Sequence, residues 1–138
     1  MISREFYKEL GKLVYSLAKA DGEIQPKEME KLIELLRATD IHSEQGEIIH
    51  LNEDKYYTEF EFMLYKKKKV AVKAAFCSFI NFIKSNELHI DEKMKKITLL
   101  LARKVLKSHK GINRLEQKML DELTQVLYAN ELQETYKQ

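Results

Sequence analysis

Proline, glycine and cysteine are scarce in this chain of 138 residues, which has one proline, four glycines and one cysteine. A single cysteine cannot form an intramolecular disulfide, so nothing in the sequence indicates an oxidising compartment. With so few prolines and glycines, the chain has few positions where a helix must break. No stretch approaches the roughly 20 continuous apolar residues that a membrane-spanning helix requires. These absences favour a helical domain without an integral membrane segment.

A large excess of charge of one sign is also missing. The 24 basic and 22 acidic residues are mixed along the chain, and the formal net charge is +2. Proteins that bind nucleic acids usually concentrate Lys and Arg on one face, so we expect no nucleic-acid partner. The N-terminal residues lack the basic-then-apolar pattern of a signal peptide, which favours the cytoplasm.

Apolar residues recur at spacings of three and four along most of the chain, which is typical of amphipathic helices. In the first helix, which we expect to begin near a Ser3 cap and to end before Gly22, they are Phe6, Leu10, Leu13, Val14 and Leu17. Signals for strands are almost absent. We therefore predict an all-α fold, a compact bundle of five to seven helices forming one domain over residues 1–132, with a frayed tail at 133–138.

Two stretches interrupt this pattern. A second helix beginning at Pro26 is expected to end near Asp40, and a polar connection follows through about Asp54. The aromatic stretch from Tyr56 to Tyr65 is weakly periodic and fits either a helix or an extended segment.

Three predicted helices begin in the same way, with an isoleucine, a capping-type polar residue and a charged first turn. The three segments are Ile24-Gln25-Pro26-Lys27-Glu28, Ile90-Asp91-Glu92-Lys93 and Ile112-Asn113-Arg114-Leu115-Glu116. Glu28 and Glu116 each lie three residues after the capping residue, the spacing of a capping box. The pattern suggests an internal pseudo-repeat of two helical hairpins that share a core. The alternative is a coincidence between ordinary helix starts.

The first repeat resembles a known family. Leu17-Ala18-Lys19-Ala20-Asp21-Gly22-Glu23-Ile24-Gln25-Pro26-Lys27-Glu28 is similar to the signature of the TerB-like tellurite-resistance domain, which also occurs near the N-terminus of DnaJ-type co-chaperones. The resemblance implies a bacterial stress-response domain with an all-helical, pseudo-symmetric bundle. It also implies an acidic surface at two Asp-Gly turns that binds a divalent metal or a partner. The second turn departs from the pattern, because His109 and Lys110 replace the Asp-Gly pair.

Asp21, Glu23 and Glu28 are the candidate site residues. Their carboxylate oxygens are suitable ligands for a divalent cation such as calcium or magnesium. The full spacing of a calcium-binding loop is missing, and each residue also has a simpler role. Asp21 is suited to a turn, and Glu28 to the positive end of a helix dipole.

Four histidines occur, at positions 42, 50, 89 and 109. None forms the close pair that would place two imidazoles on one helical face. His89 and His109 precede repeat helices and could approach each other in a zinc site, although exposed loop residues are the simpler interpretation. Cys77 has Phe76, Phe79 and Ile80 as neighbours, so we expect an inert thiol in the core.

The middle of the chain has two further features that could bind a partner. Lys66 to Lys69 form the one run of like charge, which could contact phosphate groups or simply face water. Before it, Tyr56, Tyr57, Phe60, Phe62 and Tyr65 form an aromatic cluster. If exposed, these side chains would make a binding patch, whereas core packing is the commoner outcome for aromatic residues.

No catalytic constellation is recognisable, so we expect a protein that is not an enzyme. The favoured function is a stress-response module that binds a protein partner, with a divalent cation assisting at the acidic turn. One alternative is a metal-dependent hydrolase that uses surface carboxylates and a loop histidine. Another is a scaffold that self-associates through the aromatic segment.

Overall fold

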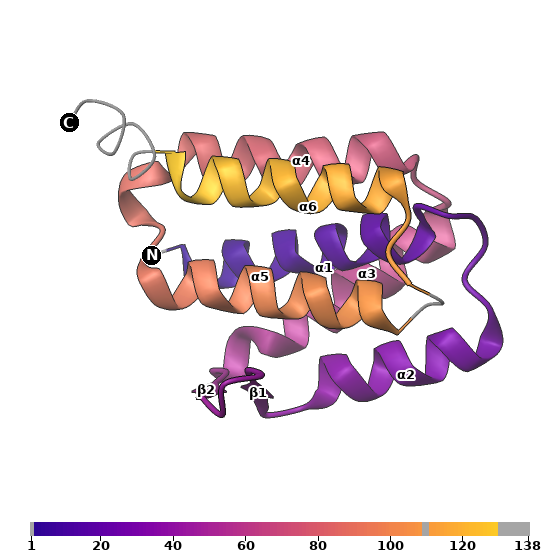
Figure 1. The fold of residues 1–138 in the computed structure, drawn as a ribbon, viewed down its shortest axis with the longest axis horizontal. Helices are drawn as coiled ribbons and strands as arrows, with labels where there is room; N and C mark the ends of the chain where they lie inside the picture. Colours follow the sequence, from indigo (N-terminus) through magenta and orange to yellow (C-terminus); the bar gives the residue numbers. More distant parts are fainter. Residues whose placement is uncertain (1, 109–110, 130–138) are drawn as a thin grey trace.

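The computed structural model describes residues 2–108 and 111–129, and in this part of the chain six α-helices surround one apolar core (Figure 1). The helices are α1 (Ser3–Lys19), α2 (Pro26–Arg37), α3 (Tyr56–Lys68), α4 (Val72–Ser85), α5 (Glu92–Lys107) and α6 (Arg114–Leu127). Two short 3-10 turns, Glu53–Lys55 and Glu87–His89, precede α3 and α5. The prediction of an all-α bundle of five to seven helices is confirmed. The tail predicted at 133–138 lies outside the described residues.

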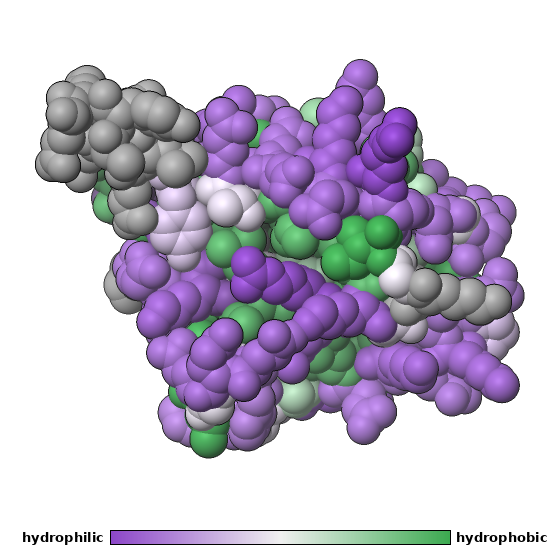
Figure 2. Space-filling model, in the orientation of Figure 1, coloured by the Kyte–Doolittle hydropathy of each residue, from purple (hydrophilic) through white to green (hydrophobic). Residues whose placement is uncertain are grey.

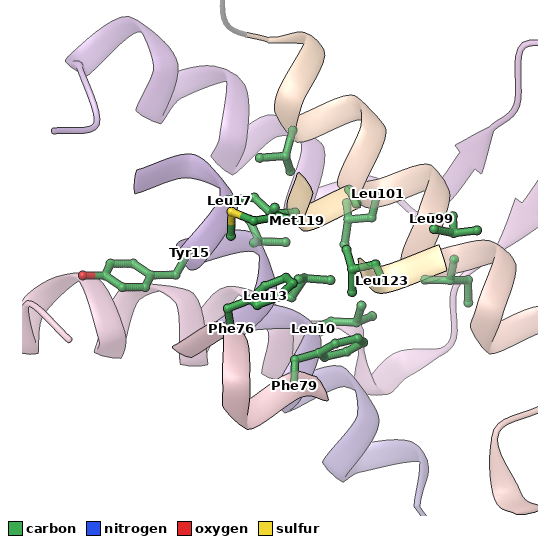
Figure 3. Packing of buried hydrophobic residues seen from close by; sticks show 14 of the residues in the cluster. Leu10, Leu13, Tyr15, Leu17, Phe76, Phe79, Leu99, Leu101, Met119 and Leu123 are labelled. Atoms are coloured by element: carbon green, nitrogen blue, oxygen red, sulfur yellow. The ribbon is translucent and has the colours of Figure 1, made fainter. Parts of the chain in front are cut away.

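Helix α1 crosses the middle of the bundle and packs against α3, α4 and α5 (Figure 1). Its buried residues include polar and small ones as well as the predicted apolar stripe: Phe6, Tyr7, Leu10, Gly11, Leu13, Val14, Tyr15, Ser16, Leu17 and Ala18. A helix that is buried on nearly all sides is the core of the domain rather than one wall of it. Around it, Phe76, Phe79, Leu101 and Leu123 close the apolar interior (Figure 3).

Helix α1 begins at Ser3 as predicted, but Ser3 is not its cap, and α2 ends earlier than predicted. Ile2 occupies the N-cap position without a side-chain hydrogen bond, and the Ser3 hydroxyl instead donates to Asp54 Oδ2 at 2.8 Å. Helix α2 ends at Arg37, before Asp40. Its last carbonyls accept hydrogen bonds from the buried Lys55 ammonium, which lies 3.1 Å from Arg37 O and 3.3 Å from Ala38 O. A cation that is distant in the sequence thus caps the end of α2 together with the local N–H of Ala38, which donates to Leu35 O at 3.3 Å.

A two-stranded antiparallel hairpin lies where the sequence suggested only a polar connection. Strands β1 (Asp40–His42) and β2 (Ile48–His50) pair with Ile41 opposite Ile49. Both isoleucines are buried and anchor the hairpin to the core, and β1 contacts α5. Three-residue strands are too short to show a reliable alternation of apolar and polar residues, so periodicity missed them.

The pseudo-repeat extends to the helix starts but not to the packing of the helices. Helix α6 lies along α5, whereas α2 packs mainly against α3. An ion pair between Arg37 Nε and Glu59 Oε1, 2.7 Å apart, also joins α2 to α3.

The prediction for Cys77 is wrong, because this thiol is exposed. Its sequence neighbours Phe76, Phe79 and Ile80 are buried on the inner face of α4. At 100° per residue, Cys77 falls outside that face.

None of the helices in residues 2–108 and 111–129 is both long enough and apolar enough to cross a membrane.

Candidate functional site

The predicted acidic turn lies between α1 and α2, at the end of the bundle where α1 finishes. Asp21 and Glu23 are both exposed there. Gly22 lies between them with a φ of 128°, a value that favours glycine, and its N–H donates to Lys19 O at 3.0 Å. The turn therefore presents two carboxylates to solvent.

Glu28, the third predicted site residue, contributes to the start of α2. The backbone N–H of Gln25 donates to Glu28 Oε1 at 3.4 Å, one of the two bonds of the predicted capping box. Glu28 is half-buried, and its position in the first turn also suits the positive end of the helix dipole.

The structure does not gather the predicted residues into one ligand set. Within residues 2–108 and 111–129, no group of three or more His, Cys, Asp or Glu side chains lies close enough to hold a metal ion. Hard cations such as calcium take six to eight oxygen ligands, so water would have to complete the shell around Asp21 and Glu23. Binding of a divalent cation at this turn stays a prediction.

The third repeat, which begins at Ile112, forms the capping box that its sequence predicts. Asn113 Oδ1 accepts from the N–H of Glu116 at 2.8 Å, and the N–H of Asn113 donates to Glu116 Oε1 at 2.9 Å. Glu116 is buried, so this carboxylate serves the start of α6 rather than an acidic surface. The middle repeat has a simpler cap, in which Asp91 Oδ1 accepts from the N–H of Met94 at 2.8 Å.

The described histidines lie apart from the acidic turn. His42 and His50 are in the hairpin, where His50 Nδ1 lies 2.5 Å from Asp40 Oδ1. His89 ends the 3-10 turn before α5 and is exposed. His109, its predicted zinc partner, lies outside the described residues. The zinc hypothesis stays a prediction.

The outer face of α3 exposes three large apolar side chains. Tyr56, Phe60 and Met63 lie at positions i, i+4 and i+7 and are 68%, 62% and 43% exposed. That spacing places the three side chains in one stripe along the helix. We call it the α3 stripe. A row of exposed large apolar side chains is a candidate binding surface.

The inner face of α3 explains why the stripe is exposed. Phe62 and Thr58 are buried against α1, and the Thr58 hydroxyl donates to Tyr7 O at 2.7 Å. The two helices approach closely at Gly11, where an added Cβ would lie 2.4 Å from Thr58 O. Because this contact fixes the rotation of α3, Tyr56, Phe60 and Met63 point outward. The aromatic segment is thus a helix that divides between core and surface, an outcome that its weak periodicity could not assign.

The lysine run continues the α3 stripe at the end of the helix. Lys66 to Lys69 are all exposed, and Lys67 lies four residues after Met63 on the same face. The helix ends at Lys68, and the C-cap residue Lys69 has a left-handed conformation with a φ of 53°. At the other end, Lys55 Nζ lies 5.0 Å from the ring centre of Tyr56. Cationic groups therefore flank an apolar stripe at both ends.

Comparison with protein-family models, curated proteins and solved structures found no match to this chain. The similarity to TerB-like domains remains an interpretation of the segment from Leu17 to Glu28.

Proposed function

We propose that this chain is a non-catalytic helical domain that binds a protein partner through the α3 stripe. The observation that supports the proposal is the exposure of Tyr56, Phe60 and Met63 in one row on a helix whose other face is packed. An amphipathic helix of a partner has apolar side chains at the same spacing, so the two rows could pack together. Membership of a TerB-like stress-response family is part of the same proposal and is supported by the first repeat.

The partner should carry acidic residues beside its apolar face. Lys66 and Lys67 are exposed at the carboxyl end of the α3 stripe, where their ammonium groups place positive charge beside its apolar side chains. Complementary charges at the rim of an interface accelerate association and select the orientation of the partner. We therefore expect a helix with leucine-like residues on one side and Asp or Glu next to them.

The enzymatic alternative receives less support. A metal-dependent hydrolase would need carboxylates and a loop histidine in one place. Asp21 and Glu23 are in the turn after α1, whereas His89 precedes α5. No observation on the described residues favours this alternative over binding.

The test uses a fluorescein-labelled amphipathic peptide with leucine on one face and glutamate on the other, followed by fluorescence anisotropy. The Phe60→Ser variant should bind at least about fivefold more weakly, since a large central side chain in an interface contributes upwards of about 1 kcal/mol. Leu88→Ser is the matched control, because Leu88 is 95% exposed and lies outside α3. Both substitutions are at the surface, so the urea midpoint should stay the same.

Three outcomes would contradict the proposal. Equal weakening by Phe60→Ser and Leu88→Ser would indicate unspecific hydrophobic adsorption. Equal binding of a peptide with lysine in place of glutamate would show that complementary charge does not contribute to the interaction. A dimer in sedimentation that Phe60→Ser dissociates would identify the α3 stripe as a self-association surface instead.

A further inference from the structure

A pocket lies where the hairpin meets α5 and α6, away from the α3 stripe. This pocket has a volume of about 320 Å³. Its apolar lining comes from Leu100, Ile112 and Leu120, and its cationic lining from Arg103, Lys104 and Lys107. Figure 2 shows an apolar strip between hydrophilic side chains on the face that α5 and α6 form. Positively charged and apolar side chains therefore line the same pocket.

The three cations come from the last turns of α5. Arg103 and Lys107 are four residues apart and share one side of the helix, with Lys104 next to them. The carboxyl end of a helix carries partial negative charge, which favours cations there. Their shared position concentrates positive charge on one wall of the pocket.

One carboxylate of the chain itself already lies against this wall. Glu44, in the turn of the hairpin, forms an ion pair with Lys107. The ion pair and the nearby Arg103 and Lys104 lower the pKa of Glu44 below its ordinary value. The turn places it there, because the N–H of Gly46 donates to Ser43 O at 3.1 Å and closes the loop around Glu44.

Glu44 is held loosely compared with the strands behind it. Its side chain is 74% exposed, whereas Ile41 and Ile49 of the adjoining strands are buried. An exposed ion pair contributes little to stability, so a competing carboxylate can displace it at small cost.

We propose that this pocket binds an acidic peptide segment, with a carboxylate of the peptide on Arg103, Lys104 and Lys107 and an adjacent apolar side chain on Leu100, Ile112 and Leu120. Glu44 occupies the carboxylate position in the free protein and must move aside, so it acts as an internal competitor. The pocket volume is close to the lower limit of ligand pockets, which suits one or two side chains of a peptide.

A peptide fits this surface better than a membrane or a nucleic acid. Polyanions are bound by extended cationic surfaces that contact many phosphates. Here the cations face a hollow, and the hairpin beside it carries the acidic residues Glu44 and Glu47. Those carboxylates would repel a flat polyanionic surface but leave room for a single inserted carboxylate.

The test measures the binding of a fluorescein-labelled hexapeptide that alternates glutamate and leucine, again by anisotropy. We expect Glu44→Gln to bind about twofold to fivefold more tightly and Lys107→Gln to bind more weakly by a similar factor, the range of one exposed ion pair. Glu47→Gln is the matched control. It removes the same charge from the same hairpin, but Glu47 pairs with Lys96 at 3.2 Å outside the pocket lining.

The controls also separate this site from the α3 stripe. Phe60→Ser should leave hexapeptide binding unchanged; a loss with this variant would place the peptide on α3 and overturn the proposal. Equal gains with Glu44→Gln and Glu47→Gln would reduce the effect to net charge and overturn it as well. A third contrary result is tight binding to phosphatidylserine vesicles that Lys107→Gln abolishes, with no hexapeptide binding.

Discussion

At Gly11, helices α1 and α3 pack so closely that no side chain fits between them. An added Cβ would lie 2.4 Å from Thr58 O and 2.9 Å from Glu61 Cβ, closer than such atoms approach. The backbone oxygen cannot rotate away, so α1 and α3 would have to separate. Of the four glycines, this one lies within a helix, where glycine otherwise costs about 1 kcal/mol relative to alanine. Close helix packing outweighs helix propensity here.

We therefore predict that Gly11→Ala lowers the free energy of unfolding by about 1 to 3 kcal/mol, the range of an overpacked core. Urea denaturation followed by circular dichroism measures it. Gly46→Ala is the comparison variant. An added Cβ has no atom within 4 Å there, so any loss of stability comes from the backbone, whose φ of 88° favours glycine, and not from a steric clash. A stabilising effect of Gly11→Ala would show that α1 and α3 can separate freely.

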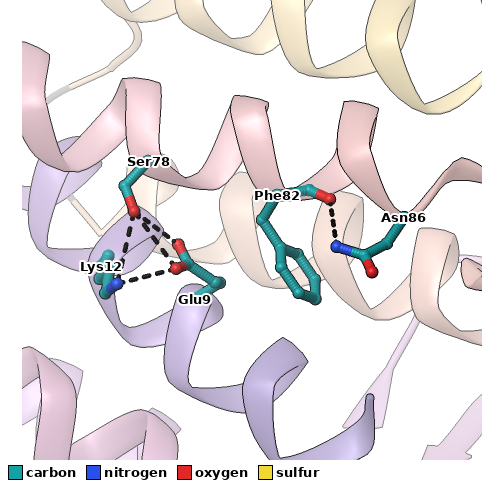
Figure 4. Close-up of polar contacts among 5 residues, drawn as sticks. All are labelled: Glu9, Lys12, Ser78, Phe82 and Asn86. Carbon is teal, nitrogen blue, oxygen red and sulfur yellow. Dashed lines mark hydrogen bonds and ion pairs between the residues drawn. The ribbon is translucent and has the colours of Figure 1, made fainter. Parts of the chain in front are cut away.

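At the scale of elements, a polar cluster joins α1 to α4 inside a largely apolar interface (Figure 4). Lys12 Nζ donates to Glu9 Oε1 at 2.8 Å, and the Ser78 hydroxyl donates to Glu9 Oε2 at 3.0 Å. The two charged side chains are 19% and 13% exposed. Burial by itself would lower the pKa of Lys12, but the Glu9 carboxylate and Tyr65 together outweigh it and raise that pKa above its ordinary value of 10.5. The ammonium is thus more stable in the folded protein than in the unfolded chain.

The raised pKa determines the direction of a pH effect. The contribution of Lys12 to stability is complete below its unfolded pKa of 10.5 and is lost as the pH rises through the higher folded value. We predict that Lys12→Met lowers the free energy of unfolding by about 1 to 2 kcal/mol at pH 8, and that this difference shrinks above pH 10.5. Lys31→Met, at an exposed position of α2, is the control for general charge effects. A difference that is constant from pH 8 to pH 11 would contradict the assignment.

At the scale of the whole molecule, burial is unevenly distributed among the helices. Helix α1 is surrounded by three others, whereas α2 buries only Leu32 and Leu36 and rests mainly on α3. Helices with few buried apolar side chains open locally at a lower free energy than the centre of a domain. The part of the domain that carries the acidic turn should therefore open more readily than α1.

Amide hydrogen exchange tests this order. We predict that amides of α1 exchange slowest, at the rate of global unfolding, and that amides of α2 exchange at least about tenfold faster. Arg37→Ala, which removes the ion pair with Glu59, should accelerate exchange in α2 while the ratio of α1 exchange to global unfolding stays the same. Equal protection of the two helices would mean that the domain opens as one unit.

Prediction from the sequence succeeded where the determinants are local. The caps at Asp91 and Asn113 and the start of α2 at Pro26 depend on residues within one helical turn, and all are present. It failed where partners are distant in the sequence. The hydrogen bond from Lys55 to the end of α2 and that from Ser3 to Asp54 join segments that no local pattern relates.

The candidate surfaces divide in the same way. Sequence alone identified the acidic turn, the lysine run and the aromatic cluster as features, since each is a run of neighbouring residues. The pocket between the hairpin, α5 and α6 could not be found in this way, because Glu44 and Lys107 are 63 residues apart.

By itself, the sequence determined that this chain is helical, where most helices begin, and that one core suffices, because helix periodicity and capping act over a few residues. Only the tertiary structure decided which side of each helix became surface. Helix α3 has apolar side chains on two faces, and the close contact at Gly11 buries Phe62 and leaves Phe60 in water. The physical reason is that a helix with little amphipathic bias takes its orientation from the neighbour against which it packs.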